Sequence, residues 1–210
     1  MTIWESVGEG LQSIIYNVAT VLLYPVLALE VAALAFVMVE FGFFTAEAVR
    51  RARSRRRLDL ETHAAAVSAA STETEAVAAV ADYLDAQPVS PVAHRARRTL
   101  LLGSLSRTRV LKALADAELE SSRKLERTRM MIRFGPILGL MGTLIPISPA
   151  LVALAKGDVT QLSNNLVIAF STTVVGLLIG GLGYLITTVR DRYYQQDTVD
   201  LEYVLDRLEV

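Results

Sequence analysis

Several hydroxyl groups and a carboxyl group deep within the long apolar stretches of this chain could do chemistry. Thr143 lies in one uncharged stretch and Ser171, Thr172 and Thr173 lie in a second, whereas Glu30 lies in a third apolar stretch. A hydroxyl oxygen can coordinate water or a small cation without the cost of burying a charge. A carboxyl group at membrane depth is by default a functional candidate. Side chains of these types in apolar surroundings suit the passage of a small cation.

Each of these groups also has an ordinary interpretation. A Ser or Thr in an apolar helix often donates to a carbonyl one turn earlier, and we keep that interpretation open for Ser171 and Thr172. Thr143 and Thr173 border or lie on stripes of small residues, so we favour an ion-path role for them. Glu30 is either a titrating acid at membrane depth or an interfacial side chain that snorkels or pairs with an arginine.

The stretches that hold these groups are long enough to cross a bilayer. A transmembrane helix needs roughly 20 apolar residues, and we predict such helices at 14–44, 133–156 and 164–188. Only Glu30 and Glu40 interrupt the first stretch. Apolar residues make up 52% of the 210 residues, which is high for a soluble domain of this length. The sequence therefore predicts an all-α membrane protein with three transmembrane helices.

Small residues recur at spacings of three and four along the second and third predicted spans. The stripes consist of Gly135, Gly139, Gly142, Pro146, Pro149 and Ala153, and of Ala169, Thr173, Gly176, Gly180, Gly183 and Thr187. Such a face lets another backbone come very close, which is how helices associate in lipid. We therefore expect a packed helical assembly around an element that moves or conducts.

Basic residues predict the orientation, because Lys and Arg near helix ends stay in the cytoplasm. None precedes residue 50, six fall between 50 and 57, and Lys156 stands alone between the last two spans. We predict a multi-pass protein of the inner or plasma membrane with its N-terminus outside and its C-terminus in the cytoplasm. The basic run fits a membrane anchor on anionic lipid headgroups better than a nucleic-acid site, so we expect no nucleic acid partner. The expected anchor residues are Arg50, Arg51, Arg53, Arg55, Arg56 and Arg57.

The remaining segments are expected to be helical too. The predicted order is an amphipathic outer-surface helix at 1–13, a helical cytoplasmic region at 45–132, an outer turn at 157–163 and a cytoplasmic C-terminal helix at 189–210. Within the cytoplasmic region we expect a helix over 61–86 and a loop at the two prolines of 87–91. One long helix should then run from near Thr108 to beyond Ala150. The C-terminal tail places Leu201, Val204, Leu205 and Leu208 on one apolar face.

Catalytic and cofactor-binding patterns are missing from the sequence. His63 and His94 have no carboxylate pair at metal-ligand spacing, and the chain has no cysteine. The run at 180–183 is Gly-rich like a phosphate loop, but no strand precedes it. We expect neither enzymatic activity nor a cofactor nor a bound metal.

Two motifs in the predicted spans carry a resemblance to a known family. Gly135-Pro-Ile-Leu-Gly-Leu-Met-Gly-Thr143 resembles the second-span motif of the MotA/TolQ/ExbB family, and Ala169-Phe-Ser-Thr-Thr-Val-Val-Gly-Leu177 is similar to its third-span motif. The three-span layout favours the ExbB/TolQ branch. The resemblance implies a homopentameric ring around single-span ExbD/TolR/MotB-like partners, each with a membrane Asp. Protons or sodium ions would pass along that Asp and along Thr143, Thr172 and Thr173, and the partner would rotate.

The resemblance also implies a smooth wall that contacts the partner helix. The members that the resemblance implies are Gly135, Gly139, Gly142, Ala169, Gly176 and Gly180, and we add Pro136, Pro146 and Gly183 from the same two spans. Pro146 and Pro149 depart from the family pattern and should bend the outer half of the second span. One departure concerns the acid: the ExbB/TolQ branch has a Glu where this chain has Ile168, so the titrating carboxyl group should come from the partner or from Glu30. A non-conducting membrane scaffold is the alternative function. A secondary transporter fits worse, because the chain lacks internal repeats.

Overall fold

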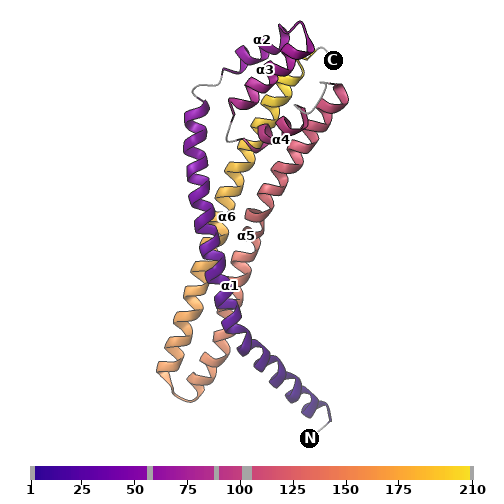
Figure 1. Ribbon diagram of the computed structural model, residues 1–210. Coiled ribbons are helices and arrows are strands. Elements are labelled where there is room, and N and C mark those ends of the chain that lie inside the picture. The colour runs from indigo at the N-terminus through magenta and orange to yellow at the C-terminus, as the bar shows by residue number, and fades with distance from the viewer. Residues whose placement is uncertain (1–2, 56–58, 88–89, 101–105, 209–210) are drawn as a thin grey trace. The chain divides into compact units, whose positions relative to one another are not determined.

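The computed structural model describes residues 3–55, 59–87, 90–100 and 106–208, without the side chains of 3–9, 12, 19, 54 and 55. All regular structure in these ranges is helical, which confirms the predicted all-α class (Figure 1). The helices are α1 (Ile3–Arg55), α2 (Leu60–Ser68), α3 (Glu73–Asp85), α4 (Pro91–Leu100), α5 (Arg107–Ala155) and α6 (Val159–Leu205). Helices α1, α5 and α6 are long and apolar enough to cross a membrane.

The chain divides into two compact units, and the three long helices contribute to both. Unit 1 comprises Met1–Glu40 and Arg129–Tyr184, and unit 2 comprises Phe41–Thr128 and Leu185–Val210. Unit 1 therefore holds the apolar stretches of α1, α5 and α6. Unit 2 holds α2, α3 and α4 together with the more polar parts of the long helices.

In unit 1, α5 and α6 form an antiparallel hairpin closed by a short turn. Gly157 adopts φ +72°, a left-handed conformation that favours glycine, and the backbone N–H of Asp158 donates to Ala153 O (2.9 Å). The Asp158 carboxylate then accepts from the backbone N–H of Gln161 (2.9 Å) and caps α6. The cap explains why the turn is shorter than the predicted 157–163.

The three long helices are continuous where the sequence suggested divisions. Residues 3–13, expected to form a separate surface helix, are the first turns of α1. The predicted long helix from near Thr108 is confirmed as α5, which continues through Pro136, Pro146 and Pro149. Helix α6 runs well past Arg190, as the sequence indicated.

Unit 2 has a core of small and aliphatic side chains. Helices α2, α3 and α4 pack with the first turns of α5 and the last turns of α6, where Leu201, Val204 and Leu205 are buried. The predicted apolar face of the C-terminal tail is therefore confirmed. Many of the core positions are alanines, which lets the short helices approach closely and bury their faces without long side chains.

The single helix predicted over 61–86 is wrong, because the chain breaks between α2 and α3. Thr72 is the N-cap of α3 and accepts from the backbone N–H of Glu75 (3.3 Å). The Glu75 carboxylate in turn accepts from the backbone N–H of Ser71 (2.8 Å). This reciprocal capping satisfies donors at the start of a new helix and outweighs the alanine-rich propensity to continue the old one.

Candidate functional site

The spans of α5 and α6 pack backbone against backbone. A Cβ atom placed on Gly176 would lie 2.6 Å from the carbonyl oxygen of Gly135 and 2.7 Å from Cα of Gly139. A Cβ on Gly135 would lie 2.7 Å from the carbonyl oxygen of Gly176. Only hydrogen fits at these positions, so the glycines permit the close approach. We call this contact the glycine seam; its members are Gly135, Gly139, Gly142, Ala169, Thr172, Gly176 and Gly180.

The seam corrects the predicted wall. Instead of facing a partner helix, most of the predicted wall residues are buried within this chain. The buried members are Gly135, Gly139, Gly142, Pro146, Ala169, Gly176, Gly180 and Gly183. Pro136 is exposed overall, although a Cβ on Gly180 would lie 2.9 Å from its Cδ. A small-residue stripe predicts a close contact but not its partner, and here the partner is the other arm of the same hairpin.

Thr172 belongs to the seam rather than to an open path. Its side chain is 5% exposed, and a Cβ on Gly142 would lie 2.6 Å from Thr172 Cβ. Its hydroxyl donates to the carbonyl of Ala169 (2.9 Å), so the ordinary interpretation holds for this residue. The expectation that Thr172 lines the ion path is corrected, because its side chain is enclosed between α5 and α6.

Thr143 and Thr173 lie at the margin of the seam. Both are half-buried. The Thr143 hydroxyl donates to Leu140 O (2.7 Å), and the Thr173 hydroxyl donates to Ala169 O (3.3 Å). Donation to the helix backbone leaves the lone pairs of each hydroxyl oxygen as acceptors. These two oxygens can therefore receive a hydrogen bond from water or coordinate a cation.

The two margins of the seam differ in exposure. On each helix, the residue one position after a seam residue lies to one side of the seam. Because α5 and α6 are antiparallel, these residues of both helices lie on the same side of the seam. Apart from half-buried Thr143 and Thr173, these are exposed: Pro136, Leu140, Phe170, Leu177 and Gly181. Residues that precede a seam position are half-buried or buried at five of seven places (Leu138, Met141, Ile168, Val175 and Ile179), and Phe134 and Ser171 are the exposed exceptions. We call the first margin the open edge and the second the covered edge.

Glu30 is buried in unit 1 on the inward face of α1. Its side chain is 3% exposed, with Val26 and Val37 buried on the same face, and its carboxyl group lies beside the backbone of Gly176. Within the described part of the chain, Oε1 has no hydrogen-bond partner. A snorkelling or arginine-paired Glu30 is therefore ruled out in this structure, and the interpretation as an acid at membrane depth remains.

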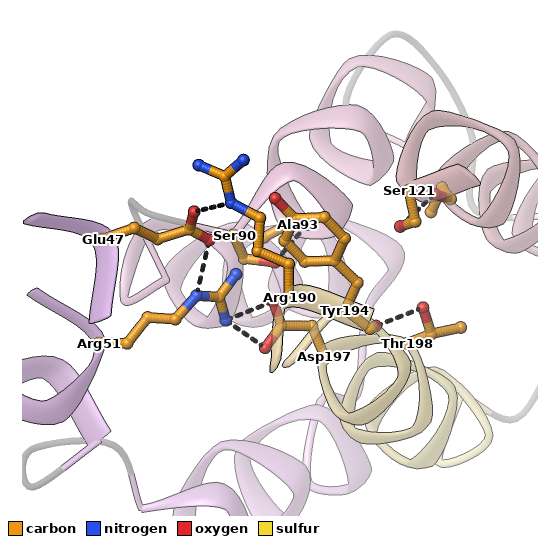
Figure 2. A network of polar contacts seen from close by, with 10 residues as sticks. Glu47, Arg51, Ser90, Ala93, Ser121, Arg190, Tyr194, Asp197 and Thr198 are labelled. Atoms are coloured by element: carbon orange, nitrogen blue, oxygen red, sulfur yellow. Dashed lines mark hydrogen bonds and ion pairs between the residues drawn. The ribbon is translucent and has the colours of Figure 1, made fainter. Parts of the chain in front are cut away.

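Unit 2 contains a buried charge cluster that the sequence analysis missed (Figure 2). Arg51 Nη1 donates to both carboxylate oxygens of Asp197 (2.9 and 2.8 Å), and Arg51 Nε donates to Glu47 (3.1 Å). Arg190 Nε donates to the other oxygen of Glu47 (3.0 Å). The cluster joins α1 to α6 with two positive and two negative side chains, so its formal charges cancel. Pairing of this kind is what allows charges to be buried.

Two tyrosine rings complete the environment of the Arg51 guanidinium. Its Cζ lies 5.1 Å from the ring centre of Tyr193 and 5.6 Å from that of Tyr194, distances at which a cation is attracted to an aromatic ring. Two patterns in the sequence could have indicated this cluster. Glu47 and Arg51 are spaced i,i+4, and Arg190, Tyr194 and Asp197 share one helical face.

The cluster changes the interpretation of the basic run. Arg51 was expected to contact lipid headgroups, but it is 7% exposed and its Nε and Nη1 donate to protein carboxylates, so that expectation is corrected. Its Nη2 has no hydrogen-bond partner among the described residues. Arg50 and Arg53 are exposed, and their anchor role stays a prediction. The side chain of Arg55 and the whole of Arg56 and Arg57 lie outside the described residues.

A buried hydroxyl pair also links α5 and α6 in unit 2. Thr187, a member of the predicted stripe, donates to the hydroxyl of Thr128 (2.8 Å), which itself donates to Leu125 O (3.1 Å). Both side chains are buried and hydrogen-bonded. Thr187 therefore has a structural partner in its own chain.

A family model described as the MotA/TolQ/ExbB proton channel family matches residues 94–202, just over half of the chain. The chain belongs to this family. The matched range contains the glycine seam and both open-edge threonines, whereas α1 with Glu30, Glu47 and Arg51 lies outside it. Together with the three apolar helices, family membership makes the chain a multi-pass membrane protein. No curated protein matches the chain.

Proposed function

We propose that this chain is the ring subunit of a membrane motor driven by an ion-motive force. Several copies, five by analogy with the family resemblance, surround single-span ExbD/TolR/MotB-like partners that each carry a membrane Asp. Protons, or sodium ions, pass between the ring and these partners, and the flux turns the partner. The ring lies in the inner or plasma membrane with the N-termini outside and unit 2 in the cytoplasm.

The observation that carries this proposal is the place of Thr143 and Thr173. They are half-buried at the open edge, and their oxygens keep acceptor lone pairs after donating to the helix backbone. Residues 134–155 and 159–189 contain no charged side chain that would trap a cation. Neutral oxygens in such a pore bind an ion weakly enough to release it.

The open edge also suggests how copies assemble. If the open edge of each copy faces the ring centre, the threonines meet the partner helix and the covered edge faces outward. The buried seam then holds each α5–α6 hairpin as one rigid element. Exposed apolar side chains elsewhere on the hairpin, such as Leu144, Val167 and Val174, are left for neighbouring copies and lipid.

One observation favours the alternative, a non-conducting membrane scaffold. Thr143, Thr172 and Thr173 all donate to their own helix, so none needs an ion or water to satisfy its donor. Purification with the co-expressed single-span partner separates the two functions. A ring with an Asp-bearing partner and proton uptake into liposomes supports the motor; a ring without partner or uptake supports the scaffold.

Two neighbouring threonines provide a matched test of the ion path. Thr173→Val and Thr172→Val each remove a hydroxyl bonded to Ala169 O and keep a branched side chain, but only Thr173 reaches the open edge. In liposomes that contain a pH-sensitive dye, Thr173→Val should abolish proton flux while native mass spectrometry shows an intact ring. Thr172→Val should retain flux. Unchanged flux in the Thr173 variant would refute the assigned path.

A further inference from the structure

Glu30 combines three observations that the proposed ion path does not use. Its side chain is 3% exposed, its Oε1 has no hydrogen-bond partner among the described residues, and its carboxyl group lies beside the backbone of Gly176. Gly176 is at the middle of the predicted span 164–188, and Glu30 is close to the middle of 14–44. The carboxyl group therefore lies near the centre of the membrane-crossing part of unit 1.

No positively charged side chain lies near Glu30 within the described part of unit 1. The spans of α5 and α6 that pack in unit 1 carry no Asp, Glu, Lys or Arg over 134–155 and 159–189. The other charged residues of unit 1 described with side chains lie toward the ends of the apolar stretches: Glu40, Arg129, Arg133, Lys156 and Asp158. Among the described residues, the backbone of Gly176 is the one neighbour that can donate to the carboxyl group. An ionised carboxylate with no cation and only this neutral neighbour is costly in such a place, so the neutral, protonated form is favoured.

We propose that Glu30 is a proton-binding site resident in the ring subunit, protonated at rest and transiently ionised during ion transport. The proposed function expects the titrating acid on the partner chain, and Glu30 adds a second acid on α1. When Glu30 passes its proton to water or to the partner's Asp on the conducting path, a carboxylate is left against the backbone of Gly176. A second proton, arriving along the same path, then binds Glu30 and restores the neutral form. The inference rests on the proposed function for its flux readout, but occupancy of the site is measurable independently.

Infrared difference spectroscopy tests occupancy directly on the complete complex in lipid nanodiscs. Besides any band from the partner Asp, a C=O stretch of a protonated carboxylic acid should be present in wild type and missing in Glu30→Gln. In wild type this component should be lost reversibly as pH rises from mildly acidic to alkaline. Glu30→Asp should keep a titrating band at a shifted frequency. The proposal is overturned if the Glu30→Gln spectrum contains the same bands as wild type. The same holds if the Glu30 band does not change with pH. It is also overturned if sodium at constant pH removes the band, because the site would then be a cation site.

Proton flux provides the second arm. Glu30→Gln keeps the shape of the side chain and mimics the neutral form, so the ring should assemble while flux falls to the level of empty liposomes. Glu30→Asp should restore measurable flux. Full flux in Glu30→Gln overturns the proposal although the proposed function stands. Absence of both proton and sodium flux in wild type instead refutes the proposed function, and the infrared titration still decides whether Glu30 binds a proton.

Discussion

Replacement of Gly176 by alanine tests the central packing feature of unit 1. The new Cβ would lie 2.6 Å from the carbonyl oxygen of Gly135 and 2.7 Å from Cα of Gly139. Both neighbours are backbone atoms of α5, so no side-chain rotation relieves the overlap. Since carbon atoms pack at about 3.5–4.0 Å, α5 and α6 must separate locally by about 1 Å.

The expected magnitude follows from the seam geometry. A gap of this size forfeits roughly a quarter to a half of the dispersion energy of the atoms in contact, and overpacking of a well-packed site typically costs about 1–3 kcal/mol. Alanine gains about 1 kcal/mol over glycine in helix propensity. Gly181→Ala in the same span makes the same propensity gain, and its Cβ meets nothing within 4 Å. The difference between the two variants therefore isolates the overlap, about 1–3 kcal/mol.

The assay is unfolding of the detergent-solubilised protein by increasing sodium dodecyl sulfate, followed by circular dichroism. Several protein concentrations are compared so that oligomerisation is held constant. Gly176→Ala should unfold at lower detergent fraction than wild type, whereas Gly181→Ala should be neutral or slightly stabilised. The double variant Gly139→Ala, Gly176→Ala should lose less stability than the sum of the losses in the two single variants. The reason is that the first substitution has already moved the two helices apart.

Equal stability of Gly176→Ala and Gly181→Ala would refute the seam. It would mean that the α5–α6 contact is looser than the structure has it, and that the stripe is free to face another helix, as first predicted from the sequence. Additive effects of Gly139 and Gly176 would likewise argue against a shared contact.

Two further predictions concern unit 2 and use the same unfolding measurement. Arg51→Met leaves buried acids uncompensated and should cost about 3–5 kcal/mol, while Arg51→Met with Asp197→Leu should recover a large part of that loss. Arg53→Met, at an exposed position, is the control and should change stability by at most about 0.5 kcal/mol; a similarly small effect of Arg51→Met would contradict the cluster. Thr72→Ala removes the α3 cap and should cost about 1 kcal/mol, whereas Thr72→Ser should be nearly neutral. Equal stability of those two variants would show that the cap is not formed.

The helix inventory was largely predictable because it depends on local patterns. Apolar stretches of sufficient length predicted the membrane-crossing parts of α1, α5 and α6, and the absence of a breaker after Thr108 predicted the length of α5. The break between α2 and α3 was missed because alanine-rich propensity was weighed without the capping residues Thr72 and Glu75. Both residues were visible in the sequence.

The candidate site was predictable in its residues but not in its contacts. The sequence placed Thr143 beside one small stripe and Thr173 on the other, whereas the structure encloses Thr172 in the seam and leaves Thr173 at its margin. The i,i+4 pair Glu47 and Arg51 was also readable from the sequence. Its bond to Asp197, 146 residues further on, was not, because no local pattern encodes a contact over that distance.

By itself, the sequence determined the membrane-crossing stretches, the faces of small residues and the family motifs, because hydrophobic length and helical periodicity are properties of one segment at a time. Only the tertiary structure decided which helix meets each face. It placed the glycines against each other, left Thr143 and Thr173 at an open edge and enclosed Glu30 without a partner for Oε1. The physical reason is that a stripe specifies how closely a helix can be approached, whereas the identity of the approaching helix depends on the packing of the whole unit.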